Sequence, residues 1–336
     1  MAKDDAAKHS VAPPSAVAST EGLATATLRD LADQAEMAAK RRSFLLAGRI
    51  SEVLQELSPD TSHWIEIKAS IARLQGFETE ARRVLNNCLE AYPLASKALQ
   101  QLMQMANSNG KWEETVQLAA SPALDLTCAD EVVRACDTLA GQGIRESALA
   151  GLSRLIDVGT EDVDVYIRAS RICVSLADAE KNNAVLGALK GLRPHNVYGH
   201  LAPYHAAVMQ TDRDGAKKAL LDLNKSFPNN SVVLNLLCDE AIDDRNAEEA
   251  NEWLNGLRGK ISGERIRKLE LQIAAVRHDW PQVVDLMKGF REANDNRFQV
   301  LNIYAMLNQE RFAEARQLIA AALENKKLKS AQRRWF

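Results

Sequence analysis

Small and apolar residues recur along this chain at intervals of 32 to 34 residues. Each interval contains one small residue, which is followed four and seven positions later by residues that are mostly apolar. Positions i, i+4 and i+7 lie on one face of an α-helix, so each interval is expected to hold a helix that buries one stripe. The stripes open at Ala47, Ala81, Thr115, Ala148, Asn182, Ala216, Ala250, Val283 and Ala315. A period of about 34 predicts a solenoid of helix-turn-helix units, in which each unit contacts only its neighbours.

Turn-forming residues stand on both sides of these predicted helices. Gly76, Gly110 and Gly143 lie where a preceding first helix must end and where a positive φ is favoured, and Asn246 is expected to take that place in a later unit. In four units a proline stands twelve residues after the small residue and ends the second helix. Pro122 lies inside a predicted second helix, which it is expected to shorten or kink.

Three segments carry the pattern most clearly: QGFETEARRVLNNCLEAYP (75–93), GKWEET (110–115) and ERFAEA (310–315). They resemble the tetratricopeptide repeat family, over about residues 28–330 and about nine degenerate repeats. The resemblance implies an all-α fold, a right-handed superhelical solenoid of antiparallel helix pairs. The expected organisation is a disordered N-terminal tail at 1–27, a solenoid at 28–326, and a basic C-terminal tail at 327–336. The repeats are expected to begin near residues 28, 62, 96, 129, 163, 197, 231, 264 and 296.

Composition narrows the class of protein further. The 336 residues carry a formal net charge of −3, so no global positive field favours nucleic acid, and we predict no nucleic-acid partner. No apolar run is long enough to span a bilayer, and the first residues lack the apolar core of a signal peptide. The five cysteines form no CxxC pair. We therefore predict a cytoplasmic protein with reduced thiols.

The sequence offers little catalytic or metal-binding chemistry. His195, His200 and His205 are five residues apart, a spacing that on a helix turns each side chain well away from the next. Cys128 and Cys136 are eight apart, which fits one helix face, although two buried thiols are favoured over a redox pair. No GxSxG, GxGxxG or P-loop motif is present. The prediction is a protein that is not an enzyme and that has no cofactor and no metal.

The resemblance implies a concave groove lined by the first helices of the pairs, and it assigns a partner-binding role to their outward-facing polar residues. Carried onto this sequence, the candidate groove residues are Arg73, Lys97, Gln100, Gln104, Asn107, Asp130, Asp137, Asp164, Arg171, Tyr198, His205, Asn235, Asp239, Lys268 and Tyr304. A wider set adds His63, Glu66, Arg265 and Gln272. Their charge alternates in sign along the chain, which would select a charge-patterned partner.

The leading hypothesis is a non-enzymatic scaffold or adaptor that binds a protein or peptide segment in this groove. Its alternative is a regulatory or substrate-presenting subunit of a separately encoded enzyme, for example in a glycosyltransferase or envelope-polysaccharide system. An RNA-binding helical repeat is disfavoured by the period and the net charge. A homo-oligomer formed through the terminal repeats is also expected, because the last unit of a solenoid leaves one face uncovered.

Overall fold

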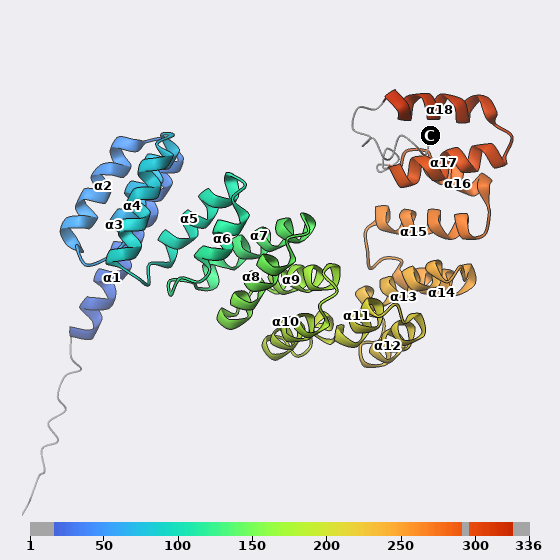
Figure 1. The fold of residues 1–336 in the computed structure, drawn as a ribbon, viewed down its shortest axis with the longest axis horizontal. Coiled ribbons are helices and arrows are strands. Elements are labelled where there is room, and N and C mark those ends of the chain that lie inside the picture. Colours follow the sequence, from blue (N-terminus) through green and yellow to red (C-terminus); the bar gives the residue numbers. More distant parts are fainter. Residues whose placement is uncertain (1–16, 291–295, 325–336) are drawn as a thin grey trace, which may run out of the picture. The chain divides into compact units, whose positions relative to one another are not determined.

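The computed structural model describes residues 17–290 and 296–324, and every element in these ranges is helical. The all-α class is therefore confirmed. The chain divides into two compact units, Met1–Leu176 and Ala177–Phe336, here called the N-terminal and C-terminal units (Figure 1). Their boundary falls inside the fifth expected repeat, between its first and second helices.

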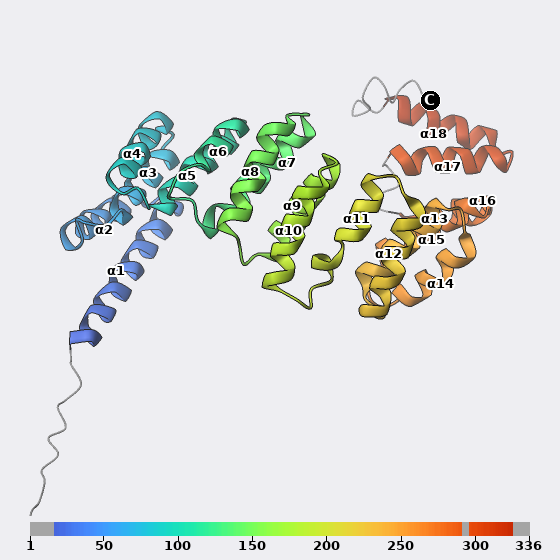
Figure 2. The ribbon, with the colours of Figure 1, turned by 60° about the horizontal axis from the view of Figure 1, so that its bottom comes forward.

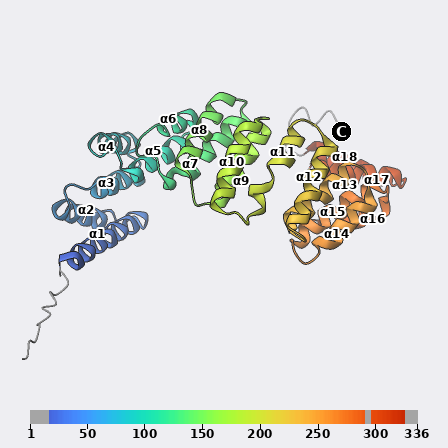
Figure 3. The same ribbon diagram turned by 90° about the horizontal axis from the view of Figure 1, so that it is seen from below.

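In the N-terminal unit, long helices alternate with short turns. The first helices of its repeats are α1 (Val17–Lys40), α3 (His63–Leu74), α5 (Ser96–Ser108), α7 (Ala129–Gly141) and α9 (Val163–Ser175). The second helices are α2 (Phe44–Leu57), α4 (Glu78–Ala91), α6 (Trp112–Leu118) and α8 (Arg145–Val158), and a 3-10 turn, η1 (Leu126–Cys128), precedes α7. First helices α3, α5 and α7 form one row and second helices α4, α6 and α8 another (Figure 3).

The C-terminal unit continues the same alternation (Figure 2). Its first helices are α11 (Ala202–Met209), which follows a 3-10 turn η2 (Val197–His200), α13 (Ser231–Asp243), α15 (Gly263–Val276) and α17 (Asn296–Asn308). Its second helices are α10 (Ala179–Leu192), α12 (Arg213–Ser226), α14 (Ala247–Leu257), α16 (Trp280–Met287) and α18 (Phe312–Glu324). Eighteen α-helices in the described residues thus correspond to nine repeats.

The predicted stripes form the core of both units. All nine small residues that open a stripe are at most 3% exposed. Most positions four and seven residues further on are buried leucines, each worth about 1.5–3 kcal/mol of burial free energy. Ser51 is polar but equally buried, and its hydroxyl donates to the Trp64 carbonyl oxygen at 2.9 Å. Pro122 is exposed and Ile319 only half-buried, so the stripe is incomplete in those two repeats.

Each turn between a first and a second helix contains one residue with positive φ, five positions before the small residue. These nine residues are Arg42, Gly76, Gly110, Gly143, Ala177, Thr211, Arg245, His278 and Glu310. The residue after it donates its N–H back into the first helix, as Phe77 does to the Ala72 carbonyl at 2.9 Å. This is the six-to-one bond of a Schellman motif, and it satisfies a carbonyl that the helix end would leave free. The expectation for Asn246 was wrong by one residue: Arg245 has the positive φ, and Asn246 caps α14 by accepting from the Glu249 N–H.

One expected boundary differs from the structure, and one expected shortening is confirmed. Helix α1 begins at Val17, so residues 17–27 are helical where a disordered tail was expected. The segment carries three alanines, which are strong helix formers, and the later turns of α1 are anchored by buried Ala35 and Ala39. Residues 1–16 and the expected basic tail lie outside the described residues. Helix α6 ends at Leu118 after seven residues, which confirms that the second helix is short near Pro122.

The turn geometry predicts that a glycine-to-alanine substitution changes the free energy of unfolding in opposite directions at Gly143 and Gly187. An added Cβ meets no atom within 4 Å at Gly143 or at Gly187, but φ is +81° at Gly143 while Gly187 lies inside α10. We expect Gly143→Ala to lower the free energy of unfolding by about 1 kcal/mol because of left-handed strain. Gly187→Ala should raise it by about 0.5–1 kcal/mol through helix propensity. Urea denaturation followed by far-UV circular dichroism measures both, and changes of equal sign would contradict the assignment.

Candidate partner-binding groove

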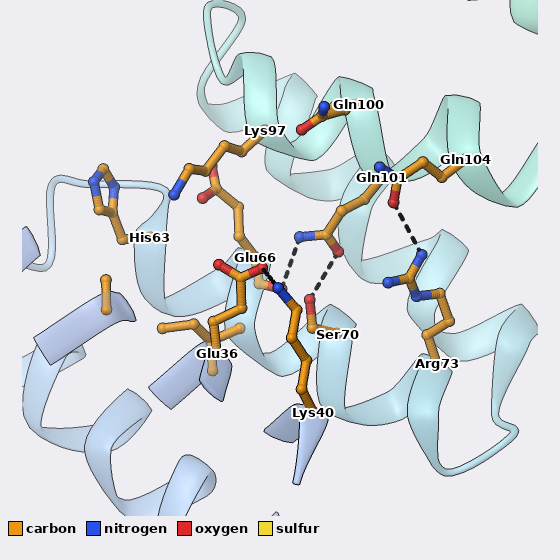
Figure 4. Close-up of a pocket in the computed structure, with 12 residues that line it drawn as sticks. Glu36, Lys40, His63, Glu66, Ser70, Arg73, Lys97, Gln100, Gln101 and Gln104 are labelled. Atoms are coloured by element: carbon orange, nitrogen blue, oxygen red, sulfur yellow. Dashed lines mark hydrogen bonds and ion pairs between the residues drawn. The ribbon is translucent and has the colours of Figure 1, made fainter. Parts of the chain in front are cut away.

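Three consecutive first helices, α1, α3 and α5, enclose a cavity of about 330 Å³ in the N-terminal unit (Figure 4). Helix α1 contributes Glu36 and Lys40, α3 contributes His63, Glu66, Ser70 and Arg73, and α5 contributes Lys97 and three glutamines. A neighbouring hollow of about 340 Å³ shares His63, Glu66 and Lys97 with it and extends to Asp125 and Thr127. The two hollows together form the candidate site, here called the α1-α3-α5 groove.

Hydrogen bonds hold much of the wall of this groove in place. The Ser70 hydroxyl donates to Gln101 Oε1 at 3.2 Å, and Gln101 Nε2 donates to the Glu66 carbonyl at 3.4 Å. Arg73 Nη1 donates to Gln104 Oε1 at 3.3 Å, so three hydrogen bonds join α3 to α5 (Figure 4). Lys40 and Glu36 form an ion pair at 3.0 Å. These side chains are ordered by one another before any partner binds.

Other polar groups in the same groove have no such partner among the described residues. Lys97 is exposed and lies in no ion pair within the described part of the chain. His63 Nδ1 is buried and finds no hydrogen-bond partner in the described ranges. A buried polar atom without a partner costs free energy, so water or a bound group is expected to complete it.

The fifteen residues predicted for the groove are divided among several environments. Lys97, Asp137, Asp164, Arg171 and Tyr304 are exposed. The half-buried ones are Arg73, Gln100, Gln104, Asp130, Tyr198, His205, Asn235, Asp239 and Lys268. The structure brings Arg73, Lys97, Gln100 and Gln104 together in the α1-α3-α5 groove.

Asn107 is a correction, because it is only 5% exposed and lies in the core. It follows buried Met103 by one helical turn and therefore faces inward. Its Oδ1 accepts from Thr115 Oγ1 at 2.6 Å, and its Nδ2 donates to Glu131 Oε2 at 2.8 Å. This buried chain, Thr115-Asn107-Glu131, connects α6, α5 and α7.

Two predicted acidic residues are engaged in bonds between neighbouring first helices. Asp130 of α7 pairs with Arg168 of α9 and, at 3.1 Å, with Arg134. Burial acts to raise the pKa of Asp130, but the hydrogen bonds and positive charges of Arg168 and Arg134 together outweigh it and keep the pKa below its ordinary value. Asp239 of α13 accepts two bonds from Arg265 of α15, at 2.6 and 2.8 Å. There burial dominates and raises the pKa of Asp239 despite the arginine.

The sequence prediction missed the contribution of α1 to the groove. Ala32, Glu36 and Lys40 are each four residues apart and line the cavity from one face of α1. That i, i+4 spacing was visible in the sequence, but the first repeat was expected to begin at residue 28 without an assigned inward face. Ser70 and Gln101 were also missed, since neither charge nor spacing distinguishes them from ordinary helix residues.

The two cysteines that the sequence offered as a possible redox pair belong to the core of the described residues. Cys128 and Cys136 are buried free thiols, and burial raises their pKa to about 11 and about 12. No group of three or more His, Cys, Asp or Glu in the described ranges is placed to hold a metal ion. Within those ranges no helix has both the length and the apolar character needed to cross a membrane.

Period, helix pairing and the buried small residue of each second helix all agree with the tetratricopeptide pattern. The chain resembles tetratricopeptide repeat proteins. No protein-family model matches its sequence, and no curated protein does. Among solved structures, a tetratricopeptide repeat protein of Parabacteroides merdae matches with 12% identity and a TM-score of 0.43, over 83% of this chain and 98% of its own.

Yeast Tom70 matches with 10% identity and a TM-score of 0.39, over 90% of this chain and 93% of its own. The anaphase-promoting-complex hetero-tetramer Cut9-Hcn1 matches with 9% identity and a TM-score of 0.38, over 91% of this chain and 88% of the matched chain. These likenesses are too distant to carry information on a partner. The tetratricopeptide-like description rests on the helices and turns of this chain.

The buried chain Thr115-Asn107-Glu131 predicts that alanine, the commonest residue at this repeat position, destabilises the protein at position 115. Six of the nine stripes open with alanine, yet Thr115→Ala should lower the free energy of unfolding by about 1–3 kcal/mol, because Asn107 Oδ1 loses its donor in the core. Thr138→Ala is the matched control, since that partly exposed hydroxyl donates to the Arg134 carbonyl oxygen of its own helix. Equal stability of the Thr115 variant and the wild type in urea denaturation would contradict the prediction.

His205 predicts a pH dependence of stability. Burial lowers its pKa to about 4, below the usual value near 6.5, so the unfolded chain binds a proton between these values and the folded chain does not. Stability from this group is therefore present above about pH 6.5 and is lost as pH falls toward about 4, by at most about 3 kcal/mol. His205→Gln should flatten the stability profile in that window, whereas exposed His195→Gln should not. If the stability of the wild type and of His205→Gln changed equally with pH in this window, the prediction would be wrong.

Proposed function

We propose that this chain is a non-enzymatic scaffold that binds an extended protein segment in the α1-α3-α5 groove. The observation that supports this most strongly is the combination of an ordered polar wall with unsatisfied groups, Lys97 and His63 Nδ1, in the same cavity. An ordered wall lowers the entropy lost on binding, and a partner that reaches Lys97 and His63 Nδ1 gives them hydrogen bonds in place of water.

The chemistry of the groove suits a polypeptide. Its glutamine side chains carry both donors and acceptors, which match the N–H and C=O groups of an extended backbone. Gln104 Nε2 has no side-chain partner among the described residues, while its Oε1 is fixed by Arg73. Lys97 favours a segment that presents a carboxylate beside these amides. A tetratricopeptide-like scaffold of this kind would hold its partner within a larger assembly; the enzyme-subunit alternative remains a hypothesis.

A charge reversal at Lys97 tests the groove. We expect Lys97→Glu to weaken binding of the partner segment at least about tenfold, since attraction to a carboxylate becomes repulsion. Affinity capture from the native lysate, read by mass spectrometry, identifies proteins lost from this bait, and calorimetry with the purified partner measures the affinity. Lys190→Glu, on the exposed face of α10, is the control of equal charge change. Capture of the same proteins by all three baits would exclude this groove as the binding surface.

A second pair of variants tests how far the surface extends along the N-terminal unit. Asp137 of α7 and Asp164 of α9 are both exposed. If the partner also crosses α7 and α9, Asp137→Lys with Asp164→Lys should lower its affinity further. An unchanged affinity would confine the contact to α1, α3 and α5.

A further inference from the structure

The turn between α1 and α2 is unusually basic. Residues 37–51 contain four cations, Lys40, Arg41, Arg42 and Arg49, and no Asp or Glu. All four are exposed. Lys40 is paired with Glu36, but none of the three arginine side chains has an ion-pair or hydrogen-bond partner among the described residues. By contrast, the exposed arginines Arg83 and Arg134 each pair with a carboxylate three or four residues away.

The same turn exposes large apolar side chains. Leu45 is 87% exposed, the highest value of any large hydrophobic residue in the described ranges, and Leu46 is 54% exposed. Both lie in the first turn of α2, one helical turn before Arg49. Met37, in the last turn of α1, is 53% exposed. Leucines beside unpaired arginines thus form one surface, here called the α1-α2 tip, made of Met37, Arg41, Arg42, Leu45, Leu46 and Arg49.

We propose that the α1-α2 tip docks the protein on an anionic lipid bilayer. Such a surface offers phosphate groups to the arginines and, a few ångströms deeper, acyl chains to the leucines. A bilayer needs no preformed pocket to accept a projecting side chain as exposed as Leu45. An acidic protein would satisfy the arginines, but it would also require a matching apolar pocket next to its carboxylates. A bilayer is therefore the partner that fits both the arginines and the leucines of the α1-α2 tip.

This docking is separate from the proposed scaffold function. Lys97 and His63, which carry the groove proposal, are not part of the α1-α2 tip, so either activity can be lost without the other. No membrane-spanning helix is needed, because attachment of this kind combines shallow apolar insertion with electrostatic attraction.

The test is flotation of the full-length protein with vesicles of phosphatidylcholine, with and without phosphatidylglycerol. Binding is expected only to the anionic vesicles and should weaken as salt is raised. Each arginine near an anionic surface strengthens partitioning about fivefold. Arg41→Glu with Arg49→Glu should therefore reduce it at least about 25-fold, and this pair avoids the strained turn residue Arg42. Leu45→Ser with Leu46→Ser should reduce partitioning about tenfold or more while leaving all the cations in place.

Matched controls separate the tip from net charge and from general surface hydrophobicity. Lys190→Glu with Arg193→Glu makes the same charge change on exposed residues of the C-terminal unit, and Leu94→Ser with Leu126→Ser removes two other exposed leucines. Both controls should bind as the wild type does, and all variants should keep its circular dichroism. The proposal is overturned by a lack of binding to anionic vesicles, by equal binding to neutral ones, or by tip variants that bind normally. Binding of poly-glutamate through Arg41 and Arg49, without vesicle binding, would instead assign the tip to an acidic protein.

Discussion

The close packing of each second helix at one small residue is the constraint on which the rest of the structure depends. The residue is at most 3% exposed in all nine repeats. Five positions earlier the backbone always turns through a left-handed residue, although only three of the nine are glycine. A left-handed non-glycine residue costs about 1–2 kcal/mol, and six repeats accept that cost. The turn geometry is thus retained even where the sequence does not favour it, because it sets the angle at which the second helix returns to the core.

This constraint explains how much of the fold could be predicted from the sequence. The second helices were recognisable because a fully buried position tolerates few residue types, so that Ala81, Ala148 and Ala250 mark the period directly. The turns without glycine gave no such signal, and Arg245 was missed in favour of Asn246. The start of α1 was missed for a related reason: residues 17–27 lack the repeat signature, and their helical tendency comes from composition alone.

The candidate site was less predictable than the fold, because polar residues on first helices can turn inward, pair sideways or face the groove. Asn107 turns inward to Thr115 and Glu131. Asp130 and Asp239 pair sideways with arginines of the next first helix. Lys97 faces the groove without an ion-pair partner in the described ranges. Spacing along the sequence gives the face of a helix to within a residue, whereas the choice of partner depends on side chains about thirty positions away, as Arg265 and Asn235 show.

The short helix α6 has a consequence for how the N-terminal unit unfolds. In a repeat array, the strength of coupling between neighbours decides whether units melt together or separately. Helix α6 is seven residues long, with Thr115 as its one buried side chain, whereas α8 buries Ala148, Gly151, Leu152 and Leu155. The second helix of the third repeat therefore buries fewer side chains than that of the fourth, and the bonds of Asn107 to Thr115 of α6 and Glu131 of α7 add contacts there. Fraying that starts at α1 must therefore break this buried chain before it can pass from the helices around the α1-α3-α5 groove to α6 and α7.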